Sequence, residues 1–256
     1  MAGVFGLKKA YNRQRVDNWP ESNNYGYFAG AHVVCTIDRI DFSNETVSLP
    51  GTNLPLAKSY ITNTTSQNLN SAYIGGGYGP HPNGPPAYQC IIERFDFSNE
   101  VVVSLGNKLT VARDSQCALS SKEYGYYAGG EGINPGSSPP SKSIIERLEF
   151  SSETVSFASY LPEGREKASP LYDENHGFIC GGEQDTQAAD NTYVTCTINR
   201  IDFSNDTLTN AESNLTHQRT TASSVQNSNH GYIGGGMSPS TSYLTSITRL
   251  DFSNNT

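Results

Sequence analysis

The histidine, cysteine and serine residues of this chain are not spaced as the known motifs for catalysis or metal binding require. The five histidines form no His-x-His or His-x-x-x-His pair, and the five cysteines include no Cys-x-x-Cys. A zinc site normally uses such close pairs. The sequence also lacks a Gly-x-Ser-x-Gly nucleophile elbow, a glycine-rich phosphate loop and the spaced aspartates of a calcium loop. We therefore expect no enzyme activity, no metal and no other cofactor; a triad assembled from distant segments is the open alternative.

Five arginines form a second group of candidates, because each stands two residues before a carboxylate. They are Arg39, Arg94, Arg147, Arg200 and Arg249. Such a set could bind anions. A buried arginine, however, needs an acid or a carbonyl as its partner. Because the position recurs along the whole chain, we expect these arginines to pair within their own repeat or with the next one.

The charge balance excludes two classes of partner. Acidic residues outnumber basic ones by 25 to 17. A nucleic-acid-binding protein or a protein docked on anionic lipid needs clusters of basic residues. No apolar run approaches the ~18 residues of a membrane-spanning helix, and the segment from Met1 to Lys9 lacks the apolar stretch of a signal peptide. We expect no nucleic acid, no membrane insertion and no dependence on an oxidising compartment.

The elements that carry these residues are repeats. A five-residue phrase such as Gly26-Tyr27-Phe28-Ala29-Gly30 recurs five times, starting at residues 26, 72, 125, 177 and 231. A second phrase follows each time, starting at Ile37, Ile92, Ile145, Ile198 and Ile247. Self-similarity at a period near 50 residues is typical of repeat architectures such as propellers.

Each repeat predicts four short strands and almost no helix. The Tyr-rich phrase is short and apolar and ends in glycine, as a strand buried on both faces does. In the second phrase, Ile37, Arg39 and Asp41 share one face of a strand, and residues 43–45 make a tight turn. An outer strand returns at residues 46–48, and an inner strand follows the arginine at positions such as Arg113. Small Ser, Thr and Ala residues suit that innermost position.

Four strands per repeat, a period near 50 and a Gly-Gly pair after the second strand resemble kelch repeats. The departures are Gly30-Ala31 in the first repeat, Phe-Asp or Leu-Glu in place of a Tyr-Asp pair, and the absence of the outer-strand tryptophan. The resemblance implies an all-β fold: a five-bladed β-propeller of four-stranded kelch-like blades. We expect one domain over residues 1–256, with repeats at about 9–49, 58–105, 113–157, 165–210 and 219–256 plus 2–7.

The two ends of the chain predict how such a ring closes. The last repeat stops after its turn and lacks an outer strand, whereas Val4 to Leu7 forms an orphan strand before the first repeat. Joining them restores a full repeat and removes exposed sheet edges. We expect residues 4–7 to pair with residues 245–252, and residues 8–15 to form an inner strand.

Residues that repeat from blade to blade predict packing. Tyr27, Tyr73, Tyr126 and Tyr232, with Phe178 as the fifth, are expected to pack between blades. Cys35, Cys90 and Cys196 share one position in different blades, too far apart for a disulfide. We expect them, with Cys117 and Cys180, to be buried free thiols. Three of the five Asn-x-Ser/Thr sequons lie in the repeated turn, where turn chemistry explains the asparagine.

Residues that vary predict binding. The segments between the second and third strands differ in length and wording at residues 77–89, 131–142, 183–195 and 237–244, whereas the turns at the opposite end scarcely change. Variable loops on a rigid scaffold are where binding residues gather, with neutral drift as the rival explanation. The candidate ligand-binding residues are Tyr78, His81, Tyr88, Asn134, Gln184, Tyr193 and Tyr243.

A second resemblance suggests a context. The wording Ile-x-Arg-Ile-Asp-Phe-Ser-Asn-Glu-Thr-Val-Ser, with Gly-Tyr-Phe-Ala-Gly, is similar to kelch-like proteins encoded by marine bacteriophages, notably cyanophages. That resemblance implies a virion or tail-fibre component that recognises a host-surface glycan or a neighbouring virion protein. The alternatives are a free five-bladed lectin and an intracellular kelch-type interaction scaffold. The expected location is the virion, or otherwise the cytoplasm.

Overall fold

The computed structural model describes residues 25–31, 34–65, 70–81, 84–132, 142–185, 192–240 and 242–254. Within these ranges the elements are strands, β1 to β25, and there is no helix. The strands pair in antiparallel fashion in small sheets. The expectation of an all-β fold is therefore confirmed.

Five larger sheets follow one another along the chain, and each repeats the same order of strands. Sheet 1 contains β1 (Tyr25–Ala31), β2 (Val34–Asp41) and β3 (Thr46–Ser48). Sheet 2 contains β4 (Thr62–Thr65), β5 (Ser71–Gly75), β8 (Ile91–Asp96) and β9 (Val101–Lys108). Sheet 3 contains β11 (Cys117–Ser120), β12 (Tyr124–Ala128), β14 (Ile144–Glu149) and β15 (Thr154–Tyr160). Sheet 4 contains β17 (Ser169–Tyr172), β18 (His176–Cys180), β21 (Ile198–Asp202) and β22 (Leu208–Asn210). Sheet 5 contains β23 (Ser223–Gln226), β24 (His230–Gly234) and β25 (Ile247–Asp251).

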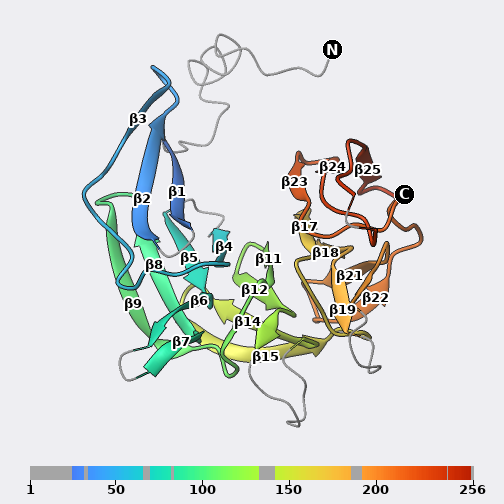
Figure 1. The fold of residues 1–256 in the computed structure, drawn as a ribbon, viewed down its shortest axis with the longest axis horizontal. Helices are drawn as coiled ribbons and strands as arrows, with labels where there is room; N and C mark the ends of the chain where they lie inside the picture. Colours follow the sequence, from blue (N-terminus) through green and yellow to red (C-terminus); the bar gives the residue numbers. More distant parts are fainter. Residues whose placement is uncertain are drawn as a thin grey trace.

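The five sheets are arranged in chain order along an arc (Figure 1), with their innermost strands β4, β11, β17 and β23 next to one another. Sheets 1 and 5 lie at the two ends of the arc. Strand order β4-β5-β8-β9 matches the predicted order of inner, Tyr-rich, second-phrase and outer strands. The predicted inner strand at residues 8–15 and the closing strand at residues 4–7 lie outside the described residues.

Backbone hydrogen bonds connect the inner ends of neighbouring sheets. The Ser115 N–H donates to the Tyr60 carbonyl at 3.1 Å, Lys167 donates to Ser115 at 2.9 Å, and Thr221 donates to Lys167 at 3.2 Å. All four residues have a left-handed backbone, with φ between 52° and 54°. Non-glycine residues adopt this conformation at a cost, so the repeated contact compensates for local strain.

The uniform turns at the other end are held by their own side chains. The Asp41 carboxylate accepts the backbone N–H of Ser43 at 2.8 Å, and Asn44 accepts that of Thr46 at 3.0 Å. The turns at residues 96–101 and 202–207 repeat these bonds. Such Asx contacts favour a tight turn. They account for the asparagines at the sequons Asn44 and Asn205 without glycosylation.

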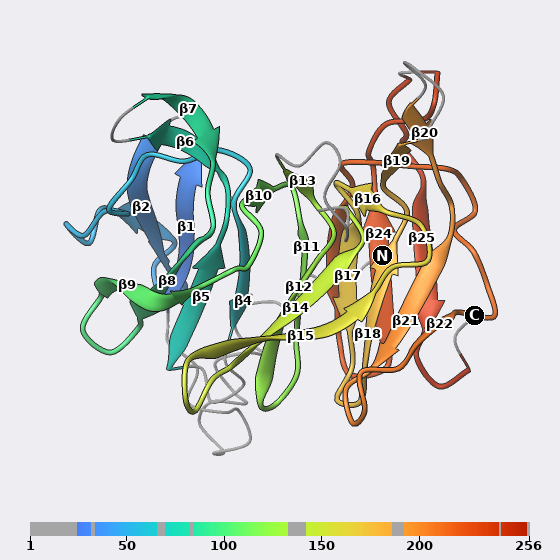
Figure 2. The same cartoon turned by 90° about the horizontal axis from the view of Figure 1, so that it is seen from below.

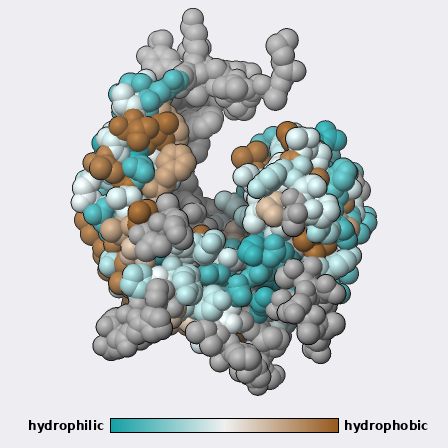
Figure 3. Space-filling view, viewed as in Figure 1, coloured by the Kyte–Doolittle hydropathy of each residue, from teal (hydrophilic) through white to brown (hydrophobic). Residues whose placement is uncertain are grey.

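The core consists of thin layers between consecutive sheets. Between sheets 3 and 4, for example, Leu119, Tyr126 and Ile145 pack on Ile179 and Ile201, and all five are fully buried. Full burial of such a side chain is worth about 1.5–3 kcal/mol. At the first end of the arc the layer is uncovered, and Figure 3 shows hydrophobic side chains on the surface of sheet 1, at the upper left.

All five cysteines are free thiols, as expected. Cys117 and Cys180 are buried, and burial raises the pKa of the Cys117 thiol to about 12. Cys35, Cys90 and Cys196 are only partly buried, so the expectation that they are buried is wrong for these three. Cys35 lies near the start of β2, and Cys90 and Cys196 lie just before β8 and β21, where they pack against the buried clusters from outside.

The variable segments form small second sheets that the sequence did not predict. One is the hairpin of β6 (Tyr78–His81) and β7 (Gly84–Tyr88). Another pairs β10 (Arg113–Asp114) with β13 (Glu131–Gly132), and a third joins β16 (Arg165–Glu166), β19 (Glu183–Asp185) and β20 (Thr192–Val194). These strands lie at one end of the larger sheets, toward the upper edge of Figure 2. We call this the loop end, and the end with the Asx turns the turn end.

Candidate functional site

The predicted tyrosines of the first variable segment lie together at the loop end. Tyr78 and Tyr88 are register partners in the β6–β7 hairpin, and their ring centroids are 5.4 Å apart in an edge-to-face arrangement. Tyr78 is exposed, whereas Tyr88 is partly buried. His81 is the last residue of β6. The hairpin therefore presents an aromatic pair.

The other predicted residues lie on different small sheets. Gln184 and Tyr193 are register partners in β19 and β20, but the Gln184 side chain is buried and its amide donates to Glu163. The Tyr193 hydroxyl accepts a hydrogen bond from the Gln218 amide at 2.8 Å. Tyr243 is 84 % exposed and pairs with Met237 through its backbone. Asn134 lies outside the described residues. The predicted residues thus form separate pairs on separate repeats.

A cluster of carboxylates that the sequence analysis missed lies beside Tyr88. Asp114 in β10, Glu131 in β13 and Glu166 in β16 each bring an oxygen within 4.8 Å of the others. Burial, and to a smaller extent the charge of Glu131, raise the pKa of the Tyr88 hydroxyl to about 12. In the sequence, an acid directly follows Arg113 and Arg165 and another follows Gly129-Gly130, but this spacing does not show that the three carboxylates meet.

Two lysines neutralise part of this cluster. Lys167 Nζ lies 3.3 Å from Glu166 Oε1 and 2.8 Å from Glu183 Oε2, and Lys142 Nζ lies 3.9 Å from Glu166 Oε1. The carboxylates could offer oxygens to a cation, but the ammonium groups already supply positive charge there. The arrangement is an ion-pair network around partly desolvated acids. It suits the binding of groups that donate hydrogen bonds and disfavours anions.

Burial dominates the titration of two of these acids. It raises the pKa of Asp114 to about 6 and that of Glu166 to about 7, while Lys142 and Lys167 act in the opposite direction on Glu166. A desolvated carboxyl group prefers its neutral form. Both acids therefore change charge near neutral pH.

We predict that the free energy of unfolding falls by about 1–3 kcal/mol between pH 5 and pH 8 because of Asp114 and Glu166. An acid whose pKa is raised on folding keeps a proton that the unfolded chain releases. Its stabilising contribution is complete below the unfolded pKa, near 4, and is lost as the pH rises through 6 to 7. Urea unfolding measured at several pH values checks this.

The double substitution Asp114→Asn with Glu166→Gln should flatten this pH dependence. The exposed Glu212→Gln should leave it unchanged. A slope that persists in the double variant would show that other groups cause it.

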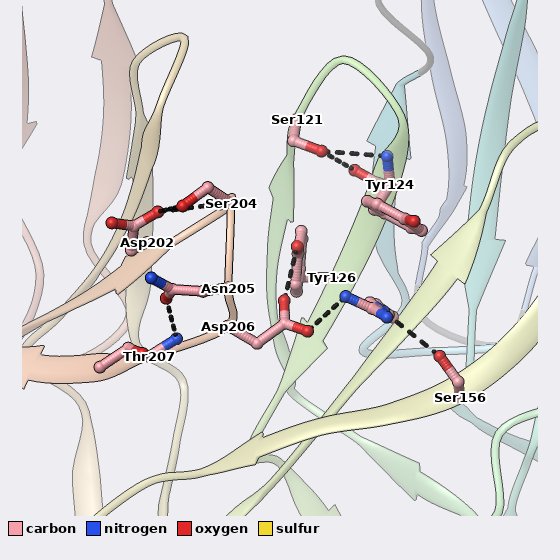
Figure 4. A network of polar contacts seen from close by, with 10 residues as sticks. Ser121, Tyr124, Tyr126, Ser156, Asp202, Ser204, Asn205, Asp206 and Thr207 are labelled. Atoms are coloured by element: carbon pink, nitrogen blue, oxygen red, sulfur yellow. Dashed lines mark hydrogen bonds and ion pairs between the residues drawn. The ribbon is translucent and has the colours of Figure 1, made fainter.

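Between the larger sheets, an arginine, a tyrosine and an acid form a repeated contact that we call the clasp. In sheet 3, the Tyr126 hydroxyl donates to Asp206 Oδ1 at 2.9 Å, and Arg147 forms an ion pair with the same carboxylate (Figure 4). Asp206 belongs to the turn of sheet 4. The Arg147 guanidinium also lies 4.5 Å from the Tyr124 ring centroid. The acid thus ties one sheet to the turn of the next.

The clasp occurs at three successive interfaces. Arg39 pairs with Glu100, Arg94 with Glu153 and Arg147 with Asp206. For these three arginines, the expectation of structural pairing with the next repeat is confirmed. They are therefore not available as a ring of anion sites.

A cleft of about 470 Å³ lies at the turn end between sheets 3 and 4. Its lining includes Lys122, Glu123, Tyr124, His176 and Asp202. Figure 4 shows Tyr124 and the turn carrying Asp202 across from each other above the clasp. The sequence analysis placed no ligand-binding residue at this end. Charged and polar side chains of the turns line the cleft together with the rings of Tyr124 and Phe203.

Neither the protein-family models nor the curated proteins that were searched include a match to this chain. Among the described residues, no helix has the length and hydrophobicity needed to cross a membrane.

Proposed function

We propose that this chain is a non-enzymatic binding module that recognises its ligand with the loop end. The observation that carries this proposal is the contrast between the two ends. The turn end repeats one Asx turn, whereas the loop end carries three small sheets of different strand composition, β6-β7, β10-β13 and β16-β19-β20, and the described residues of the last repeat form only isolated bridges there. A scaffold needs no such diversity, so it favours a composite binding surface.

The architecture that we propose is a ring of five kelch-like blades. Its support is the five consecutive sheets with one strand order and the chain of backbone bonds along their inner ends. Sheet 5 has no outer strand among the described residues. In the ring, residues 4–7 provide that strand.

A neutral glycan is the ligand that the loop end suits best. Tyr78, Tyr88 and Tyr193 offer ring faces and edges for pyranose rings, and the Gln218 amide beside Tyr193 can bond hydroxyl groups. The carboxylates near Tyr88 repel sulfated and sialylated sugars. An array that carries neutral and anionic glycans tests the class directly.

The context that we propose is a bacteriophage virion, with the chain as a tail-fibre component that contacts a host-surface glycan. The support is its resemblance to kelch-like chains of marine phages. Recognition of a neighbouring virion protein, a free lectin and an intracellular scaffold are the alternatives. Binding to a protein partner with no glycan binding on the array would favour the first or the last of these.

Alanine at Tyr88 or Tyr193 should weaken glycan binding by about 1–3 kcal/mol, as at an interface hot spot. Stability should change little at Tyr193, which is half-exposed. Alanine at the buried Tyr126 should lower stability instead and leave the affinity of the folded protein intact. Calorimetric titration and thermal melts of the three variants check this. Normal binding by both loop variants would place the site elsewhere.

A further inference from the structure

The same aromatic stack joins each sheet to the next. The Tyr27 ring stacks on Phe97 at 5.4 Å between centroids, and Tyr73 stacks on Phe150 at 5.2 Å. Tyr126 stacks on Phe203 at 5.0 Å, and Phe178 on Phe252 at 5.3 Å. In every case the first ring belongs to the Tyr-rich strand of one sheet and the second to the turn of the following sheet. Four interfaces therefore share one geometry.

The clasp accompanies this stack where both partners are present. The acid stands three residues after the stacking phenylalanine, as Glu100 follows Phe97. At the fourth interface the tyrosine is replaced by Phe178, and the sequence has Asn255 where the acid would stand. The phenol and the acid are thus absent together, which indicates that the two residues are retained for the hydrogen bond between them.

Among the described residues, sheet 5 carries the tyrosine and the arginine of this contact without their partners, and sheet 1 carries the phenylalanine and the acid without theirs. In sheet 5, Tyr232 and Arg249 occupy the tyrosine and arginine positions. Within the described part of the chain, neither side chain forms an ion pair or a stack on a phenylalanine. In sheet 1, Phe42 and Glu45 occupy the turn positions, and both are exposed. Glu45 has a left-handed φ of 60°, and its counterparts Glu100, Glu153 and Asp206 have φ between 55° and 59°.

The apolar residues of the terminal sheets are uncovered in the same way. Ile247 is 71 % exposed, whereas its four counterparts in sheets 1 to 4 are at most 1 % exposed. Phe28 is 65 % exposed, whereas its four counterparts in sheets 2 to 5 are at most 2 % exposed. Ile247 occupies the position that faces the next sheet, and Phe28 the position that faces the preceding one. Each terminal face is therefore one side of a missing layer.

We propose that the outward faces of sheets 5 and 1 bind each other within one chain. Phe42 stacks on Tyr232, Glu45 bridges Tyr232 and Arg249, and Phe28 and Ile247 share one apolar layer. The proposal extends the ring described above, but it uses sheet faces rather than the edge strand at residues 4–7. It does not involve the loop end.

The occupant of each face is the other end of the same chain rather than a second copy. Sheets 1 and 5 terminate one arc and lie on the same side of the molecule, at the upper left and upper right of Figure 1. Because both faces belong to one chain, their contact is intramolecular and does not depend on protein concentration. A second copy at micromolar concentration competes poorly with such a partner.

Charge reversal tests the contact. Glu45→Arg and Arg249→Glu should each lower the melting temperature by about 2–4 °C, and the double variant should regain at least half of the summed loss. Arg94→Glu with Glu153→Arg is the matched cycle at an interface that is already formed. Should a reversed variant fail to fold, Glu45→Gln and Arg249→Gln give the same cycle at a smaller amplitude.

Light scattering on the same variants assigns the partner. A monomer with a melting temperature independent of concentration, and coupling between positions 45 and 249, supports closure within one chain. If the losses in melting temperature at positions 45 and 249 are additive while positions 94 and 153 show coupling, the proposed contact between sheets 1 and 5 is wrong. Coupling that appears only in a dimer or larger oligomer would overturn the assignment to one chain. Glycan binding is measured separately, so the two proposals can fail independently.

Discussion

Replacing Glu146 by alanine will lower the free energy of unfolding by about 3–5 kcal/mol. Glu146 and Arg113 are both completely buried, and Arg113 Nη2 lies 2.9 Å from Glu146 Oε2. The Glu146 carboxylate also accepts the Thr110 backbone N–H at 2.8 Å. Burial lowers the pKa of Arg113 to about 10, so the guanidinium remains charged at neutral pH. Without the acid, a buried cation is left with one carbonyl partner, that of Tyr127.

The Arg113 guanidinium has few hydrogen-bond partners, and this allows a control that removes both charges. Arg113 Nε and Nη1 have no hydrogen-bond acceptor among the described residues. Removing both charges with Arg113→Met and Glu146→Leu should therefore recover most of the loss, because apolar residues of similar volume can replace a buried ion pair. Denaturant unfolding of the single and double variants measures this. A double variant as unstable as Glu146→Ala would show that packing, and not charge, determines the loss.

The repetition made much of the fold predictable. Each layer must bury one Tyr-rich strand, so the phrase that begins at Gly26 recurs with its apolar residues in place. The alternation of residues in the second phrase predicts a strand. The Asp-Ser-Asn residues that follow predict the turn that leads to the outer strand, because their side chains bond the nearby backbone. Because their position recurs in every repeat, Arg39 and its counterparts were expected to pair with an acid or a carbonyl, and Arg39, Arg94 and Arg147 pair with an acid of the next sheet. Two of the small sheets at the loop end were not predicted because they pair residues that precede an inner strand, Arg113–Asp114 and Arg165–Glu166, with residues that follow the Gly-Gly pair.

The electrostatic cluster and the buried cations show why the rest could not be predicted. Lys58 pairs with Glu93, Arg113 with Glu146, and Arg165 with the Asn199 amide. The sequence shows a basic residue and a polar residue about 35 positions apart, but only the strand register places one beneath the other. Asp114, Glu131 and Glu166 come from two neighbouring repeats. Their raised pKa values depend on burial, which no spacing in the sequence reveals.

Replacing Gly129 by alanine will lower the free energy of unfolding by about 2–4 kcal/mol, from left-handed strain and overpacking together. Gly129 has φ of +63°, and a Cβ atom there would lie 2.2 Å from the Arg165 carbonyl oxygen. That oxygen accepts the backbone N–H of Gly130 at 3.0 Å. The clash is with backbone, so no side-chain rotation relieves it. The loss should appear as a lower midpoint in denaturant with an unchanged slope.

Gly51→Ala separates the two causes. Gly51 also has a positive φ, +91°, but nothing lies within 4 Å of the Cβ position. Its alanine variant suffers only the strain of the left-handed backbone, about 1–2 kcal/mol. The excess loss at Gly129 measures how closely the glycine pair after β12 approaches the Arg165 carbonyl of β16 in the next repeat. If the two alanine variants lose the same free energy of unfolding, the neighbouring repeats move apart enough to accept a methyl group at position 129. The glycine pair would then serve the turn alone and not the contact between repeats.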